Sequence, residues 1–238
     1  MLDTPTNLKS LLKDPTLLRT QAYVNGAWID GEGTFDVINP ARGDVIAQVT
    51  DLTRAQVTEA IAAAEVAQKD WAKWTGKERA AVLRRWFDLM VENTDDLATI
   101  LTAEMGKPLA EAKGEIGYGA SFIEFFAEEA KRIYGETIPG HQRDKRITVI
   151  KQPIGVAASI TPWNFPNAMI TRKAAPALAA GCAMVARPAE LTPLSALALG
   201  VLAERAGIPA GVLNIVTTSD ASSTGLEFCE NPTVRKLT

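Results

Sequence analysis

The chain has 238 residues, with 25 Lys and Arg against 28 Asp and Glu, so its formal net charge at pH 7 is −3. This mild acidity gives no electrostatic footprint for nucleic acid or for an anionic membrane, and we expect neither as a partner. Two cysteines and one histidine are too few for a disulfide framework or a set of zinc ligands. No run approaches the roughly 18 apolar residues of a membrane span, and residues 1–5 show no signal peptide. We therefore expect a cytoplasmic protein with reduced thiols and no metal site.

The first half of the chain predicts a polar N-terminal helix, short strands and then a run of long helices. Asn25-Gly26 between apolar residues is a strong hairpin signal. Thr53 and Gln56 form a capping box, and Gly106 is a typical helix stop. The elements expected after the polar helix are a hairpin at 23–29, strands at 35–40 and 44–49, and helices at 53–71, 77–92, 95–106 and 108–135.

Residues 138–153 form a distinct segment in which the apolar period changes back to two. Residues 146–151 alternate and carry polar residues at both ends, which is typical of an exposed strand. We expect an edge strand or an arm that reaches a partner subunit, and hence a homo-oligomer. The chain then divides into strands and helices at 1–137, the arm at 138–153, and a core at 154–238.

The last third alternates apolar strands with helices. The expected strands lie at 154–160, 182–186, 212–216 and 234–238, and the helices between them at 167–180, 192–206 and 221–229. This order predicts an α/β fold with a doubly wound, Rossmann-like parallel sheet. Ligands of such sheets bind at the carboxyl ends of the strands, although no G-x-G-x-x-G or Walker loop is present.

The first of these strand ends carries Thr161-Pro162-Trp163-Asn164-Phe165-Pro166. Two prolines around an aromatic pair make a rigid, non-helical loop. One interpretation is a packed turn whose Trp163 and Phe165 belong to the core. The other is a loop that aims the Asn164 amide at a developing oxyanion.

The second strand end carries Arg187-Pro188-Ala189-Glu190. A carboxylate at this place can hold a ribose 2′-hydroxyl and disfavour a 2′-phosphate. The alternative is a solvated charge pair in front of a helix, where a glutamate is electrostatically favoured.

These segments resemble the aldehyde dehydrogenase superfamily over nearly the whole chain. The resemblance rests on Thr161–Pro166, Lys173–Cys182 and Arg187–Glu190, supported in order and spacing by Asn25–Trp28, Asn39–Ala41, Glu104–Leu109 and Pro153–Val156. Within the superfamily the chain most resembles bacterial succinate-semialdehyde dehydrogenases. That similarity rests on Ala120–Glu124, Glu128–Gly135, Ile138–His141 and Met169–Lys173.

The resemblance implies an enzyme that oxidises an aldehyde to an acid with NAD or NADP, through a cysteine thioester. Asn164 matches the oxyanion-hole asparagine of the family. Arg172 matches an arginine that contacts the distal carboxylate of succinate semialdehyde, a role suited to a bidentate guanidinium; the alternative is a surface charge on a helix. The positions that match the cofactor cleft are Ile160, Thr161, Pro162 and Trp163, together with Arg187 and Glu190.

Two departures from the family pattern bear on the cofactor. Arg187 stands where the family has a lysine that contacts the ribose, so adenosine binding is expected to be altered. Glu190 stands where close bacterial relatives often carry a small residue compatible with NADP, and its carboxylate favours NAD slightly.

The family's nucleophile and general base have no match in this sequence. Cys182 begins an expected buried strand, Cys229 lies near a helix C-terminus that disfavours a thiolate, and His141 lies in a loop. Because no candidate nucleophile is present, we expect the chain to be inactive by itself. Because Thr238 falls inside an apparent strand, we expect the amino-terminal half of a dehydrogenase. The alternatives are a short non-catalytic protein that binds a nucleotide or pairs with a full-length subunit, and a dehydrogenase of another semialdehyde such as glutarate semialdehyde.

Overall fold

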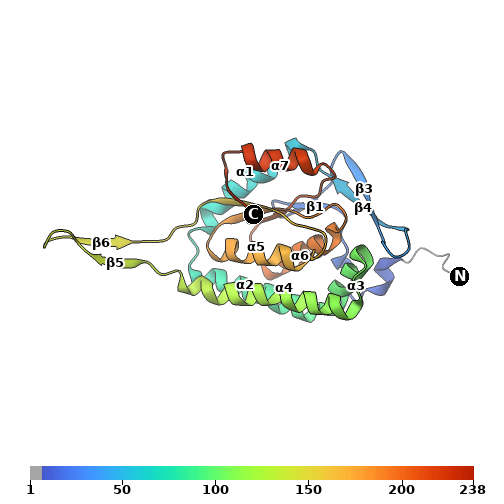
Figure 1. The fold of residues 1–238 in the computed structure, drawn as a ribbon, viewed down its shortest axis with the longest axis horizontal. Helices are drawn as coiled ribbons and strands as arrows, with labels where there is room; N and C mark the ends of the chain where they lie inside the picture. Colours follow the sequence, from blue (N-terminus) through green and yellow to red (C-terminus); the bar gives the residue numbers. More distant parts are fainter. Residues whose placement is uncertain (1–6) are drawn as a thin grey trace.

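The computed structural model describes residues 7–238, and its centre is a six-stranded sheet with the order β10-β7-β8-β9-β1-β2 (Figure 1). Four neighbouring strands run parallel: β7 (Val156–Ile160), β8 (Ala183–Arg187), β9 (Leu213–Ile215) and β10 (Val234–Leu237). The hairpin of β1 (Ala22–Val24) and β2 (Ala27–Ile29) joins β9 in antiparallel orientation. The predicted doubly wound α/β class is confirmed, and the first hairpin extends the same sheet.

Helices cover both faces of the sheet. One face is covered by α1 (Arg54–Trp71) and α7 (Ala221–Glu230), the other by α5 (Ala168–Ala179) and α6 (Pro193–Ala206) (Figure 1). Alternation along the strands explains the two layers, since Val156 and Ala158 pack with the α1 side while Ala157 packs with the α5 side. Outside α5 and α6 lies a further layer, made of α2 (Gly76–Glu92), α3 (Thr94–Met105) and α4 (Leu109–Glu129).

Helix boundaries follow local signals at several places. Thr53 and Gln56 form the expected capping box of α1, and Gly106 adopts a left-handed φ of 82° at the end of α3. The helix expected over 108–135 is shorter, because it ends at Glu129 and continues as a 3-10 turn over Ala130–Arg132.

The helices α5 and α6 start without a side-chain cap of their own. Two buried glutamates from the outer layer replace it. Glu104 accepts hydrogen bonds from the backbone N–H groups of Leu194 and Ser195 at 2.7 and 2.8 Å, and Glu115 caps α5 in the same way. Both carboxylates meet the positive end of a helix, where negative charge is stabilised.

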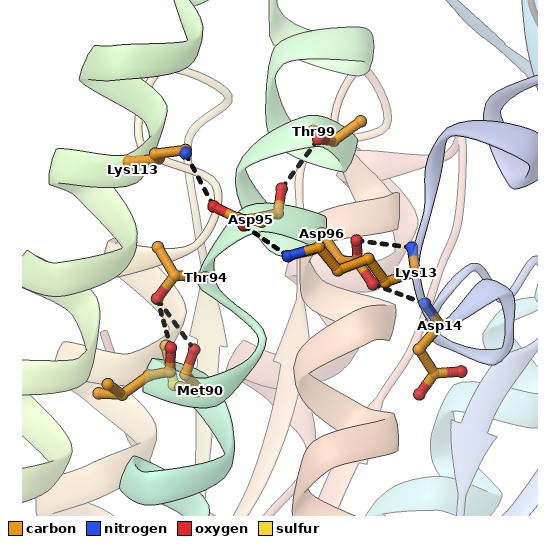
Figure 2. Close-up of polar contacts among 9 residues, drawn as sticks. Lys13, Asp14, Met90, Thr94, Asp95, Asp96, Thr99 and Lys113 are labelled. Atoms are coloured by element: carbon orange, nitrogen blue, oxygen red, sulfur yellow. Dashed lines mark hydrogen bonds and ion pairs between the residues drawn. The ribbon is translucent and has the colours of Figure 1, made fainter.

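The predicted polar N-terminal helix is wrong for the described residues. Before β1, the described residues form two 3-10 turns, Leu8–Leu11 and Pro15–Leu17. The buried Asp96 carboxylate accepts the backbone N–H groups of Lys13 and Asp14, while the neighbouring Asp95 pairs with the Lys13 side chain (Figure 2). In a continuous helix the N–H groups of Lys13 and Asp14 would bond to carbonyls of the helix itself. They would then be unavailable to Asp96, so these contacts to α3 favour the two short turns.

Two further hairpins lie outside the central sheet. One joins β3 (Gly33–Ile38) and β4 (Val45–Asp51), close to the predicted strands. The other joins β5 (Glu136–Pro139) and β6 (Arg146–Val149) and projects far from the body of the molecule (Figure 1). The expected protruding arm is therefore a two-stranded hairpin. None of the described helices combines the length and the apolar character that a membrane crossing requires.

Candidate functional site

The carboxyl ends of the parallel strands meet at one edge of the sheet. Ile160 lies opposite Arg187 in the register of β7 and β8, and the Thr161 N–H donates to the Arg187 carbonyl at 3.1 Å. The Val216 N–H likewise donates to the Ala186 carbonyl at 2.9 Å. The segments Thr161–Pro166 and Arg187–Glu190 are thus neighbours in space, as expected for segments that follow adjacent parallel strands.

The loop after β7 presents its central residues to solvent. Trp163 is 51% exposed and Phe165 is 39% exposed, so the packed-turn interpretation is wrong for these two rings. Pro162 and Asn164 are exposed as well, whereas Thr161 and Pro166 are buried at the two ends. The loop therefore holds Asn164 at the surface between buried anchor points.

Lys107 and Glu115, which were not among the predicted site residues, hold this loop. Lys107 donates from Nζ to the Asn164 carbonyl at 3.1 Å and to the Glu115 carboxylate, and Nζ lies 3.8 Å from the centre of the Phe165 ring. The sequence alone could not show that Lys107 contacts the loop, because 57 residues separate Lys107 from Asn164.

Arg172 lies in the second turn of α5 and is exposed. Its guanidinium lies 5.6 Å from the centre of the Phe122 ring. Arg172 also lines a cleft of about 380 Å³ together with Lys173 and Lys236. Partial burial, and then the charges of Arg172 and Lys236, lower the pKa of Lys173. The cleft is therefore cationic, and an anionic group is the ligand that its charges favour.

Arg187 and Glu190 form an ion pair, with 2.7 Å between Nη2 and Oε2. The Arg187 side chain is only 4% exposed and also donates to the Thr218 carbonyl at 3.1 Å, whereas the Glu190 side chain is 44% exposed. Partial burial acts to raise the pKa of Glu190, but hydrogen bonds and the charge of Arg187 lower it overall. The fully solvated pair considered above is wrong for Arg187, and only the carboxylate reaches solvent.

The strand ends also offer polar atoms suited to a dinucleotide. Thr161 Oγ1 and Arg187 Nε are buried and have no hydrogen-bond partner in the part of the chain described. The Glu190 carboxylate is an exposed acceptor, and a Cβ on Gly225 of α7 would lie 3.8 Å from Ile160 Cδ1, so that side chain faces α7. A hydroxyl, a guanidinium N–H and a carboxylate at one sheet edge fit a nucleotide with ribose hydroxyls.

The thiols and the imidazole lie away from this edge. Cys182 is buried just before β8, at the opposite end of that strand from Arg187, where it lines the Arg172 cleft, and Cys229 is exposed near the end of α7. His141 is exposed in the turn of the β5–β6 hairpin.

The comparisons with known proteins agree with this fold. A model of the aldehyde dehydrogenase family matches residues 28–238. The glutarate-semialdehyde dehydrogenase of Pseudomonas aeruginosa is 65% identical over 229 residues, which are 95% of this chain and 47% of that protein. The NADP(+) succinate-semialdehyde dehydrogenase GabD of Escherichia coli is 61% identical over 228 residues, again 95% of this chain and 47% of that protein.

A solved structure described as an E. coli NADP-dependent enzyme has a TM-score of 0.93 at 61% identity, covering 95% of this chain and 47% of that chain. The chain thus spans about half the length of the curated relatives it matches. The match of the family model over most of the chain, and the agreement in fold, show that the chain belongs to the aldehyde dehydrogenase family.

Proposed function

We propose that this chain forms the cofactor-binding part of an NAD(P)-dependent semialdehyde dehydrogenase. The observation that carries the proposal is the joint placement of the Asn164 loop and the Arg187–Glu190 pair at one edge of the parallel sheet. The nucleophile would lie outside residues 1–238, because Cys182, although it lines the Arg172 cleft, is buried before β8, and Cys229 lies near the end of α7. The 238-residue chain by itself would then have no turnover.

In this proposal Asn164 stabilises the reacting oxygen. Its side-chain amide donates a hydrogen bond to the aldehyde oxygen as that atom gains negative charge, and a donor fixed in advance lowers the barrier most. NAD(P), when bound, supplies the acceptor of a hydride. The residues that would hold it are Ile160, Thr161, Pro162, Trp163, Arg187 and Glu190.

The Glu190 carboxylate bears on the choice between NAD and NADP. It would accept from a ribose hydroxyl and repel a 2′-phosphate, which favours NAD. The E. coli relative is named for NADP(+), so this preference would distinguish the present chain from it.

Arg172 would bind the distal carboxylate of the substrate. Its exposure and the neighbouring Lys173 and Lys236 suit an acidic aldehyde. Succinate semialdehyde is the substrate we propose, with glutarate semialdehyde as the second candidate because the P. aeruginosa relative carries that name. One guanidinium at the distal end selects an acid without fixing the chain length between the two groups.

The three parts of the chain would have separate tasks. Residues 1–137 and 154–238 would form the cofactor-binding domain, and the arm at 138–153 would join subunits of a homo-oligomer. The free thiols of Cys182 and Cys229 favour a reducing, cytoplasmic setting. A short protein that binds a nucleotide without catalysis is the alternative from a different class, and it requires the same strand-end residues but no Asn164 function.

The substrate assignment is tested by Arg172→Ala in the intact enzyme, which carries this chain and the proposed nucleophile. Loss of a bidentate carboxylate contact should raise KM for succinate semialdehyde by about 10- to 100-fold, with a much smaller change for a neutral aldehyde. Steady-state kinetics with both aldehydes measure this difference. Arg132→Ala, which removes an exposed arginine paired with Glu129, is the matched control and should leave KM for both aldehydes unchanged. Equal effects of Arg172→Ala on both aldehydes would remove Arg172 from the substrate site.

A further inference from the structure

The Asn164 loop has little support from its own residues. It spans 161–167 between the end of β7 and the start of α5. The residue before α5, Asn167, is fully buried, yet its side chain makes no hydrogen bond among the described residues and does not cap the helix. Backbone hydrogen bonds hold the ends of the loop, from the Thr161 N–H to the Arg187 carbonyl and from the Met169 N–H to the Phe165 carbonyl. The position of Asn164 between them therefore depends on groups from other elements.

Lys107, in the connection between α3 and α4, supplies one fixed point. Its side chain is only 9% exposed, and its ammonium group donates to the Asn164 carbonyl while lying against the face of the Phe165 ring. A cation held over an aromatic face and on a carbonyl is attracted by both. Lys107 thus contacts two consecutive residues at the exposed centre of the loop.

Glu115, on α4, supplies the second fixed point. Its side chain is 1% exposed, one oxygen accepts from Lys107, and the other accepts from the backbone N–H groups of Asn167 and Ala168 at 3.0 and 3.2 Å. A buried glutamate with these partners is satisfied both by an opposite charge and by the positive end of α5. The ion pair consequently ties the middle of the loop to the start of the helix that follows it.

We propose that Lys107 and Glu115 are positioning residues for the Asn164 amide. This inference rests on the proposed function, in which that amide meets the aldehyde oxygen. Holding the Asn164 carbonyl fixes the backbone from which the side chain departs, and so restricts where the amide can point. A misplacement of a catalytic donor by about 1 Å can lower a rate by roughly two orders of magnitude, so a remote clamp of this kind affects turnover.

The test is Lys107→Met in the intact enzyme, which carries this chain and the proposed nucleophile. Methionine fills a similar volume, but it removes both the contact to the Asn164 carbonyl and the ion pair that holds the Glu115 carboxylate against the α5 N–H groups. We expect hydrogen exchange of the Asn167 and Ala168 amides to become about tenfold faster, because Glu115 is no longer held. We also expect kcat for the aldehyde to fall about tenfold while KM stays within about twofold.

Two further variants keep the experiment decisive. Lys113→Met removes a nearby surface lysine that pairs with Asp95, and it should change neither exchange nor kcat. If Lys107→Met does not fold because Glu115 is left as a buried charge, Lys107→Met/Glu115→Gln removes both charges, and the same changes are expected from it.

Native exchange at Asn167 and Ala168 in the folded variant would overturn the proposal, as would faster exchange with unchanged kcat or with a change in KM alone. An intact enzyme, carrying this chain and the proposed nucleophile, that neither oxidises aldehydes nor binds NAD(P) would overturn the proposed function and the catalytic part of this inference. Exchange in the same samples would still decide whether Lys107 holds the loop.

Discussion

At the scale of single residues, the cofactor choice that we propose for Glu190 involves a buried arginine. Its carboxylate accepts from Arg187 Nη2 at 2.7 Å, and the Glu190 side chain remains 44% exposed to solvent. Glu190→Ser would remove the repulsion of a 2′-phosphate and would also free the guanidinium to bind one. We expect the ratio of Kd for NADPH to Kd for NADH to fall by about tenfold or more, measured by cofactor fluorescence. Glu204→Gln, on α6 beside Trp28, should leave the ratio unchanged; an unaltered ratio in Glu190→Ser would contradict the assignment.

A second residue-scale prediction concerns acid stability and Asp95. Hydrogen bonds and charges of Lys113 and Lys13 lower the pKa of Asp95 to about 2 from its ordinary value of 3.8 (Figure 2). A carboxyl with a depressed folded-state pKa contributes stability above the unfolded value, and that contribution disappears as the pH falls toward the folded value. Asp95→Asn should therefore lower Tm at pH 7, and the difference from the native protein should shrink between about pH 4 and pH 2.

Thermal unfolding at several pH values measures this difference. Because Lys13 and Asp95 are exposed, the difference at pH 7 should also shrink in about 1 M salt. A constant difference from pH 7 to pH 2 would show that Asp95 acts through something other than its charge.

At the scale of elements, the contact between α4 and α5 depends on one glycine. A Cβ on Gly119 would lie 2.4 Å from Asn167 Oδ1, 3.1 Å from Thr171 Oγ1 and 3.3 Å from Ala168 Cα, and both Asn167 and Thr171 are fully buried. Gly119→Ala should lower the free energy of unfolding by about 1–3 kcal/mol through overpacking.

Gly117 on the same helix is the matched control. A Cβ there meets nothing within 4 Å, so Gly117→Ala should raise the free energy of unfolding by about 0.5–1 kcal/mol through helix propensity alone. Urea denaturation measures both. Equal and small effects of the two substitutions would show that the helices can separate at Gly119 without cost.

Local signals predicted most of these elements and failed where a distant group intervened. The capping box of α1 and the glycine stop of α3 are contained within a few residues, and both are where the sequence placed them. The polar N-terminal helix was wrong because Asp96, more than 80 residues away, binds the backbone N–H groups of Lys13 and Asp14. No periodicity within the segment could reveal that competitor.

At the scale of the whole molecule, the β5–β6 hairpin is the feature that lacks a partner within the described residues. Ile138 and Ile147 are paired in register and exposed by 38% and 43%, on the same face as Val149. Thr137 and Thr148 occupy the opposite face. The first face is mostly apolar, with Glu136 opposite Val149 near the base of the hairpin, and a mainly apolar face opposite a polar one supports the proposed role of the arm in joining subunits.

The arm is tested by Ile138→Asp/Ile147→Asp. We expect the native protein to be an oligomer and the variant to dissociate to monomers, because charges would enter an apolar contact. Thr137→Asp/Thr148→Asp, on the other face, should leave the mass unchanged. Light scattering coupled to size exclusion measures all three. A monomeric native protein, or an oligomer unaffected by both variants, would contradict the role of the arm.

The sequence by itself determined the α/β class, the order of strands and helices, and the family, because apolar periods, caps and motifs are encoded within short stretches. It also predicted that Asn164, Arg187 and Glu190 follow parallel strands, and the structure brings their segments to one sheet edge. Only the tertiary structure decided that Trp163 and Phe165 are exposed, that Arg187 is buried, and that Lys107 and Glu115 hold the loop. These properties depend on contacts between groups tens of residues apart, whose energies exist only once the helices have packed against the sheet.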